Sequence, residues 1–353
     1  METIKTIVET GYKFNNRFIK ILNGVISSCK KQHYKFQPVE LGELQDTPAS
    51  LRPILVVGAS TTWSKTTAAY LYENGFLPII IGFEFDDNFS SFVTQNHFRD
   101  AYTLTHMLCS EKQRRCAYIG FNAHSFGDLL KIKGLKKALK DTGHDIGDED
   151  IFPFNGSAID VISSLLANIK KYDTVFCAND TFAFLLTSVL REKNHFDIVS
   201  FGDLYLKHYS AIPFYSISPD YYNMGKLAVE LYSLYSQYQT LSKSTFYVTS
   251  KFDFISTTDA GFNFQSNTMY ALTQNSEKNI DLLNIAIEKC DEIDLKMLDF
   301  IMKNYTYEDI AAELYLSTTS IKKRLRKIFC TLGITSKSEL SALLKAHKLN
   351  FEI

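Results

Sequence analysis

Two short helices near the carboxyl end of this 353-residue sequence begin in the same way, and the second one is rich in cations. Thr306 and Ser317 each follow an apolar residue, and another apolar residue comes five positions after that one. This is the pattern of a helix cap with a hydrophobic staple. Residues 314–317 form a turn of the length that joins helix-turn-helix elements. Residues 320–328 then carry five cations and no acid. These residue types at this spacing predict double-stranded DNA as a partner.

The second of these helices divides into a buried face and an outer face. Ile321, Leu325 and Ile328 recur at the helical period and should face a core. Residues near the start of such a helix reach base edges in the major groove, where Lys or Arg can bind the O6 and N7 atoms of guanine. The residues predicted to contact DNA are Ser317, which caps the helix, and Thr318, Thr319, Lys322, Lys323 and Arg326. Thr306 and Lys337 are predicted to add phosphate contacts. The competing interpretation is a solvated basic face on a small helical packing domain.

The charges of the whole chain balance, with 38 Lys and Arg against 39 Asp and Glu, so any nucleic-acid binding has to come from a local patch. Residues 294–353 carry a net charge of +3, and residues 1–293 carry a net charge of −4. This asymmetry favours a sensing body with a nucleic-acid-binding tail. The N-terminus is too charged for a signal peptide, and no apolar run is long enough to span a bilayer. The six cysteines show no paired spacing. We therefore expect a cytoplasmic protein with reduced core cysteines, no cofactor and no metal.

The long body of the chain alternates short apolar runs with helical stretches. The expected strands are 4–8, 34–39, 53–58, 77–83, 91–95, 117–121, 175–178, 198–201, 214–218 and 246–254. The expected helices include 17–31, 127–141, 158–171, 181–193 and 221–238. This alternation predicts an α/β fold with two doubly wound parallel sheets. Polar residues follow the strands, at the edge where such sheets bind ligands. The set favours a small-molecule cleft, although any one of these residues is also a good turn former or helix cap.

Several segments of the body occur in the order found in one family. Residues 53–81 are a strand–helix–strand that ends in Gly-Phe-Leu-Pro-Ile-Ile-Ile, and residues 116–140 read CAYIGFNAHSFGDLLKIKGLKKALK. They are followed by VFCANDTFAFLLTSVL at 175–190, IVSFGDL at 198–204 and SISPDYYNMGKLAVEL at 216–231. This series resembles the sensor domain of LacI/GalR-type regulators, which has the type I periplasmic-binding-protein fold. The resemblance implies a two-lobed body.

The tail resembles the helix-turn-helix of LuxR/GerE-type regulators. Residues 308–311, Leu314, Ser317, residues 321–322 and Ile328 fall at the spacing of that family, and so do Leu332, Gly333 and Ile334. Tyr315 departs from it, because that turn position is commonly Gly and a positive φ there would strain a tyrosine. Such heads usually bind as dimers, and the final helix offers Leu340, Leu343, Leu344 and Ala346, which are dimer contacts or core residues with equal weight.

The resemblance also implies ligand contacts in the body. These residues follow strands or lie on the helix after a strand: Asn15, Phe18, Ser60, Trp63, Phe83, Glu84, Lys131, Asn179 and Asp180. Lys131 stands where sugar-binding members commonly have Arg, and Phe83 where many have Asp. A lysine binds adjacent hydroxyls less well than an Arg fork does, so an ordinary hexose or pentose is a poor expectation. Trp63 is more often partly buried core than a stacking platform, and Asp180 could also cap the helix that follows it.

Together these patterns predict a ligand-responsive DNA-binding transcriptional regulator that works as a homodimer. Residues 1–258 would bind a sugar-like effector between two lobes, about 1–110 plus 240–258 and 111–239. Residues 259–288 would form a linker and coupling helix, and residues 289–353 the LuxR-type head. One alternative is a regulator whose cleft is vestigial and whose input is a partner protein. The other is a sugar-acting enzyme with an interaction tail, which the absence of a catalytic constellation in the sequence disfavours.

Overall fold

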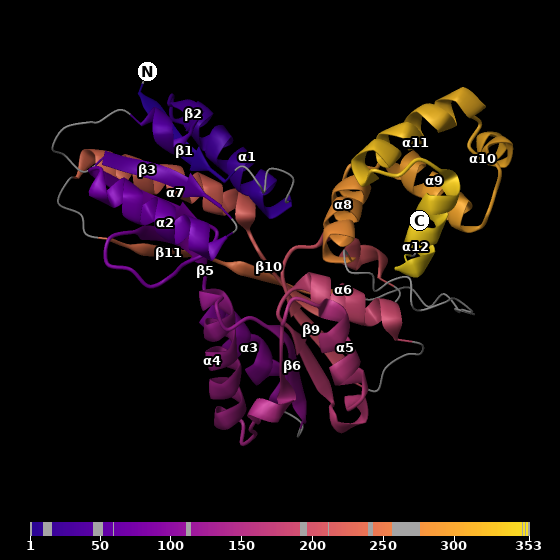
Figure 1. The fold of residues 1–353 in the computed structure, drawn as a ribbon, viewed down its shortest axis with the longest axis horizontal. Helices are drawn as coiled ribbons and strands as arrows, with labels where there is room; N and C mark the ends of the chain where they lie inside the picture. Colours follow the sequence, from indigo (N-terminus) through magenta and orange to yellow (C-terminus); the bar gives the residue numbers. More distant parts are fainter. Residues whose placement is uncertain are drawn as a thin grey trace. The chain divides into compact units, whose positions relative to one another are not determined.

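The computed structural model describes residues 2–9, 16–44, 52–58, 60–110, 114–190, 196–210, 212–238, 243–255, 276–347, 349 and 351. These residues form two compact units (Figure 1). The first unit contains residues 1–112, 122–145 and 218–251. The second contains residues 113–121, 146–217 and 252–353, so the helical tail belongs to the same unit as one of the two sheets.

Each unit is built on one six-stranded sheet. The first sheet has the strand order β11-β5-β4-β3-β1-β2, and its strands are β1 (Thr3–Val8), β2 (Lys35–Val39), β3 (Arg52–Val57), β4 (Phe76–Ile81), β5 (Ser91–Gln95) and β11 (Thr245–Val248). The second has the order β12-β10-β9-β8-β6-β7, and its strands are β6 (Cys116–Phe121), β7 (Ile151–Pro153), β8 (Thr174–Cys177), β9 (Asp197–Phe201), β10 (Phe214–Pro219) and β12 (Ser250–Ile255). Where the register is described, the paired strands are parallel.

Helices connect the strands and then make up the tail. Those of the body are α1 (Asn16–Lys31), α2 (Thr61–Glu73), α3 (His97–Cys109), α4 (Phe126–Asp141), α5 (Ala158–Leu166), α6 (Asp180–Val189) and α7 (Tyr221–Gln237). Short 3-10 helices cover Leu41–Glu43, Asp148–Asp150, Ile169–Lys171 and Tyr205–Tyr209, and the last of these is called η5. The tail has α8 (Ser276–Glu288), α9 (Glu292–Met302), α10 (Tyr307–Glu313), α11 (Thr318–Leu332) and α12 (Lys337–Ala346).

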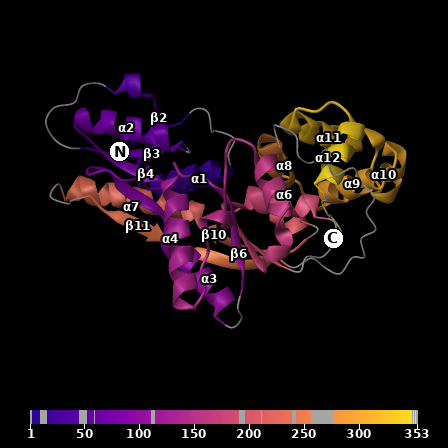
Figure 2. The ribbon, with the colours of Figure 1, turned by 60° about the horizontal axis from the view of Figure 1, so that its bottom comes forward.

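The first sheet is covered on both faces, as a buried parallel sheet requires. Successive side chains of a strand point to opposite faces, so β3 supplies both cores. Leu55 and Val57 pack with residues of α1 and α7, while Ile54 and Val56 pack with residues of α2. Figure 2 shows α2 on one side of this sheet and α7 on the other. The apolar runs read from the sequence are therefore continuous because both faces are buried.

Two glycines let α1 and α7 approach closely. A Cβ atom on Gly24 would lie 2.0 Å from the carbonyl oxygen of Tyr222, and one on Gly225 would lie 2.1 Å from that of Ile21. No side chain fits at such distances, so glycine is required where the two helix backbones meet. The contact holds α7 on the face of the sheet that α1 covers.

The second unit has one continuous apolar core that runs from its sheet into the helical tail. Strand residues such as Ala117 and Val175 belong to it together with the buried faces of α5 and α6. Ile280 and Leu283 of α8 are fully buried in the same cluster, which also includes residues of α9, α10, α11 and α12. The tail is therefore packed onto the sheet unit through side chains.

The predicted fold class is confirmed, and most strands lie within one or two residues of their expected positions. One strand was predicted wrongly: the run 246–254 is two strands, β11 and β12, which belong to different sheets. The short strand β7 was not predicted, since it has three residues and no buried side chain. Four cysteines are buried as expected, but Cys330 is exposed on α11. Within the described residues, no helix is both long and apolar enough to cross a membrane.

Candidate functional site

The helix-turn-helix begins with the two caps that the sequence predicts. The Thr306 hydroxyl accepts from the backbone N–H of Asp309 (3.1 Å), and the Asp309 carboxylate accepts from the N–H of Thr306 (2.9 Å). The hydrogen bond from the Thr306 hydroxyl is the main cause that lowers the pKa of Asp309. The Ser317 hydroxyl accepts from the N–H of Ser320 (3.1 Å) and starts α11. Both helix starts are thereby fixed relative to the turn between them.

The turn closes through two backbone hydrogen bonds around Tyr315. The N–H of Leu316 donates to the carbonyl of Ala311 (2.9 Å), and the N–H of Tyr315 donates to that of Ala312 (3.3 Å). This pair of bonds is a Schellman motif, which places its central residue in the left-handed region. Tyr315 accordingly has a φ of 53°, a positive value of the kind expected at a turn position that is commonly Gly. Its side chain is 94% exposed, so contacts within the described chain do little to offset the strain.

The two faces of α11 are as predicted. Ile321, Leu325 and Ile328 are buried, with at most 5% of each residue exposed. The outer face carries most of the residues predicted to contact DNA: Thr319, Lys322, Lys323 and Arg326 are exposed, and Thr318 is half-buried. The helix therefore presents cations to solvent on the side away from its core.

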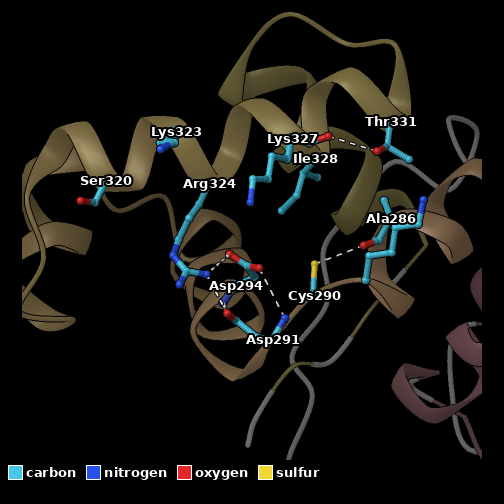
Figure 3. A pocket seen from close by; sticks show the side chains of 11 residues that line it. Ala286, Cys290, Asp291, Asp294, Ser320, Lys323, Arg324, Lys327, Ile328 and Thr331 are labelled. Atoms are coloured by element: carbon cyan, nitrogen blue, oxygen red, sulfur yellow. Dashed lines mark hydrogen bonds and ion pairs between the residues drawn. The ribbon is translucent and has the colours of Figure 1, made fainter.

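Arg324 is a cation of α11 that forms ion pairs inside the head. Its guanidinium donates to a carboxylate oxygen of Asp291 (2.8 Å) and to one of Asp294 (2.9 Å), and both acids lie at the start of α9 (Figure 3). The hydrogen bond from Arg324 is the main cause that lowers the pKa of Asp291. Arg324 thus fixes α11 against α9, and the sequence analysis missed this role.

Two lysines gather at the start of α10. The ammonium of Lys322 lies 5.5 Å from the centre of the Tyr307 ring, and that of Lys337 lies 5.4 Å from it. Lys337 also donates to the carbonyl oxygen of Tyr305. Thr306 caps the same helix, whose N-terminus carries a partial positive charge. Three predicted DNA contacts therefore lie close to Tyr307: Thr306, Lys322 and Lys337.

The final helix combines core and surface residues. Leu340 and Leu344 are fully buried, whereas Leu343 and Ala346 are half-buried. The latter two line an apolar groove of about 280 Å³ together with residues of α8 and the end of α11. Of the four residues considered for dimer contacts, two are core residues and two are accessible.

The tail also contacts the body of its own unit directly. The carboxamide oxygen of Asn284 in α8 accepts from the backbone N–H of Leu206 in η5 (2.9 Å). Leu349 forms a β-bridge with Ser210, and the Phe351 ring lies 5.1 Å from that of Tyr209. The head is therefore held at two places, by α8 and by residues that follow α12.

The His347 side chain lies in this second contact. Its ring centre is 5.6 Å from that of Phe184, and its carbonyl oxygen accepts from the Ser188 hydroxyl (3.4 Å). The residue is 3% exposed, and burial lowers the pKa of its imidazole to about 4. The contact is thus built around a neutral histidine.

In the first unit, Ser60 and Trp63 lie together at the start of α2. The Ser60 hydroxyl accepts from the N–H of Trp63 (3.3 Å), and the N–H of Ser60 donates to the Glu9 carboxylate (3.1 Å). Trp63 is half-buried, and its ring lies against Gly58, where a Cβ atom would be 2.7 Å away. Glu9 was not predicted, although it directly follows the first strand.

Phe18, Phe83 and Glu84 occupy different environments in the same unit. Phe18 is buried in the core, and the Arg17 guanidinium lies 6.0 Å from the half-buried Phe83 ring. Burial raises the pKa of Glu84, although Tyr247 donates a hydrogen bond to it (3.1 Å). Asn15, the remaining predicted contact here, lies outside the described residues.

Lys131 is buried on α4 in the first unit. Its ammonium pairs with the Asp128 carboxylate (3.0 Å), and Asp128 also accepts from the N–H of Asn122 (3.1 Å). His97 lies nearby, and burial, followed by the charges of Lys131 and Arg17, lowers the pKa of its imidazole well below the usual range. The charge of Lys131 is balanced inside the unit.

Asn179 and Asp180 stand at the end of β8 in the second unit. Asn179 caps α6 by accepting from the N–H of Phe182 (3.1 Å). Asp180 is 2% exposed and accepts from the Ser200 hydroxyl, from the Ser216 hydroxyl (3.0 Å) and from the N–H of Leu204 (2.9 Å).

The carboxylate of Asp180 therefore links the start of α6 to β9, to β10 and to the segment that follows β9. Burial raises its pKa, and the positive charge of Lys207, which is 1% exposed, opposes this shift. Its assignment as a ligand contact stays a prediction.

Comparison with solved structures places this arrangement in a known fold. A transcriptional regulator CelR–cellobiose complex matches with a TM-score of 0.60 and 15% identity, over 73% of this chain and 85% of that one. The transcription regulator CcpA of Lactococcus lactis matches with a TM-score of 0.58 and 16% identity, over 73% and 100%. GanP, a glucose-galactose binding protein from Geobacillus stearothermophilus, matches with a TM-score of 0.56 and 11% identity, over 72% and 98%.

These similarities confirm the type I periplasmic-binding-protein-like fold of the body that the sequence led us to expect. At identities this low they establish the fold alone. No family model matches the sequence, and no curated protein matches it.

Proposed function

We propose that this chain is a ligand-responsive DNA-binding transcriptional regulator. Residues 1–258 would sense the effector, residues 259–288 would couple the sensor to the head, and residues 289–353 would form a LuxR-type DNA-binding head. The observation that carries the proposal is a doubly capped helix-turn-helix with exposed cations on α11, joined to a body with the fold of known regulators.

In this proposal α11 is the recognition helix. Lys322, Lys323 and Arg326 would read base edges in the major groove, with Thr318 and Thr319 at the start of the helix. Ser317 would hold that start in place, since it caps the helix. Thr306 and Lys337 would contact phosphates, because both lie at the capped N-terminus of α10.

We infer a sugar-like effector for the body. The solved structures of similar fold include a cellobiose complex, a putative ribose operon repressor from Burkholderia thailandensis and a glucose-galactose binding protein. Ser60, Trp63, Phe83 and Glu84 of the first unit offer the aromatic and polar groups that such ligands require. Asn179 and Asp180 are the candidates in the second unit.

Coupling between sensor and head would use the contacts inside the second unit. The N–H of Leu204 donates to Asp180, η5 follows, and Leu206 in η5 donates to Asn284 of α8. An effector shifts the equilibrium between two states of the body only by the difference between its binding free energies for them. Such a shift would move α8 and the head. Two heads in a homodimer would then change their spacing, with Leu343 and Ala346 as candidate contacts between copies.

Selection of genomic DNA fragments by the purified protein tests the proposal. The wild type should enrich an imperfect palindrome, since a symmetric dimer reads two half-sites. Lys322→Ala/Arg326→Ala should lose the enrichment, while Lys296→Ala/Lys303→Ala on α9 should keep it because both of those lysines are ion-paired there. Absence of any enrichment at low salt, where phosphate contacts are strongest, would reject DNA binding.

A regulator whose input is a partner protein is the second candidate. The specific observation in its favour is that the charged residues expected to bind a ligand are engaged within the chain. Lys131 pairs with Asp128, Asp180 accepts from three donors, and Glu84 accepts from Tyr247. A thermal-shift screen separates the two functions. Stabilisation by a sugar, nucleoside or amino acid would support an effector, and a flat response to all of them would support the partner protein.

A further inference from the structure

A polar cavity opens on the flank of α11 that lies away from Tyr307. It has a volume of about 580 Å³ and is lined by the end of α8, the start of α9 and one side of α11 (Figure 3). At 100° per residue, Lys327 lies about 140° around the helix from Lys322, and Arg324 about 200°. Lys323 and Arg326 lie between these two flanks. We call this cavity the flank pocket.

Three lysines contribute to the wall of the flank pocket: Lys289, which follows α8, and Lys323 and Lys327 of α11. All three are exposed, and none of them forms an ion pair with any residue that the structure describes. Three positive charges therefore belong to residues of one pocket wall.

Other polar side chains of the flank pocket already have partners within the chain. Arg324 is fixed by Asp291 and Asp294, so these two carboxylates do not neutralise the lysines. The Cys290 thiol donates to the carbonyl oxygen of Ala286 (3.3 Å), and burial raises its pKa to about 12, so it is not a reactive thiolate. With four cations and two acids in the wall, the net charge of the pocket favours an anion and disfavours a cation.

We propose that the flank pocket binds a phosphate group through Lys289 and Lys327. The source of that phosphate rests on the proposed function: a DNA strand bordering the major groove. An α-helix with its side chains is about as wide as the groove, so both of its flanks face a sugar-phosphate backbone. Thr306 and Lys337 would serve one flank, and the flank pocket would serve the other.

Lys289 connects the flank pocket to α8, which none of the DNA contacts predicted from the sequence does. It comes one residue after α8, the helix whose Asn284 accepts from the N–H of Leu206 in η5. Lys327 comes from α11, so the pocket brings the coupling helix and the recognition helix to one phosphate. A change in the position of α8 would alter phosphate binding directly.

The first test measures DNA affinity against salt concentration for the full chain. Removal of two phosphate contacts by Lys289→Gln/Lys327→Gln should lower the slope of log Kd against log salt by about 1.8. The change should be equal on an enriched site and on an unrelated duplex, so that sequence preference is kept. Lys289→Arg/Lys327→Arg should keep the slope, and Lys296→Gln/Lys303→Gln is the matched control on α9.

The second test titrates inorganic phosphate into the DNA-free protein at constant ionic strength and follows the thermal midpoint. A reduced salt slope in Lys289→Gln/Lys327→Gln supports the pocket with DNA as the source. An unchanged slope, with phosphate stabilising the wild type and not this variant, supports the pocket with a free phosphate compound as the source. If neither effect occurs, the inference is overturned. If the wild type binds no duplex at all, the titration still decides on the pocket while the proposed function fails.

Discussion

Asp180 offers the sharpest test of how the second unit is held together. Its carboxylate is 2% exposed and accepts from Ser200, Ser216 and Leu204, with the charge of Lys207 nearby. Asp180→Ala would leave the Leu204 N–H without its acceptor and would remove the negative charge that acts on the buried Lys207 ammonium. Removal of one of two interacting buried charges typically costs about 3–5 kcal/mol.

The hydroxyls of Ser200 and Ser216 keep the expected loss of unfolding free energy within that range. The Ser216 hydroxyl also lies 3.4 Å from the carbonyl oxygen of Gly202, and the Ser200 hydroxyl 3.5 Å from that of Tyr215, so both have a second acceptor. The N–H of Leu204 has no such freedom, and an unsatisfied buried donor costs about 1–3 kcal/mol. We therefore expect Asp180→Ala to lower the free energy of unfolding by about 4 kcal/mol.

Urea denaturation followed by far-UV circular dichroism measures this loss, and hydrogen exchange of the Leu204 amide locates it. Asp173→Ala is the matched control, because Asp173 lies just before β8 in an exposed pair with Arg115 and should cost about 1 kcal/mol. Lys207→Met combined with Asp180→Ala should cost less than the sum of the single changes. A loss below about 1 kcal/mol for Asp180→Ala, or full additivity, would refute the reasoning.

Two further predictions concern the head. Tyr315→Gly should raise the free energy of unfolding by about 1 kcal/mol, because glycine removes the cost of φ 53° and the exposed ring contributes little, whereas Tyr315→Ala should not. Thermal unfolding measures both, and equal effects of Gly and Ala would contradict the strain argument. For His347, the folded pKa of about 4 lies below the ordinary value of 6.5, so its contribution to stability is present above pH 6.5 and is lost as the pH falls toward 4. Between pH 7 and pH 5 this loss is about 2 kcal/mol, and His347→Phe should remove that part of the pH dependence in urea unfolding.

Much of the fold could be predicted because buried parallel strands read as continuous apolar runs. β3 and β4 were found within a residue or two, since each has four consecutive buried residues. The split at Thr249 was missed because β11 and β12 follow each other with only one residue between them. β11 pairs with β5, whose residues lie far earlier in the chain, whereas β12 lies beside β10 in the other sheet. The alternation of apolar and polar residues along a strand does not show which of two sheets the strand joins.

The sensor residues show a different limit. The residues predicted from the resemblance do lie at strand ends and helix starts, where Ser60 and Asn179 are caps. Their partners could not be read from the sequence, because Glu9 is 51 residues from Ser60 and Tyr247 is 163 residues from Glu84. A polar residue at a strand end can serve the fold or a ligand, and only the groups that surround it distinguish the two.

The cations of α11 make the same point within a single helix. In the sequence Lys322, Arg324 and Lys327 belong to one basic run, and of these three only Lys322 is predicted to contact DNA. In the structure they point in different directions around the helix. Lys322 lies over Tyr307, Arg324 pairs with the acids of α9, and Lys327 lines the flank pocket. The acids that neutralise Arg324 lie 30 and 33 residues earlier, at the cap of another helix. A count of five cations therefore overstates the charge available to DNA by one, and the remaining four divide between the outer face and two flanks, as a helix seated in a groove requires.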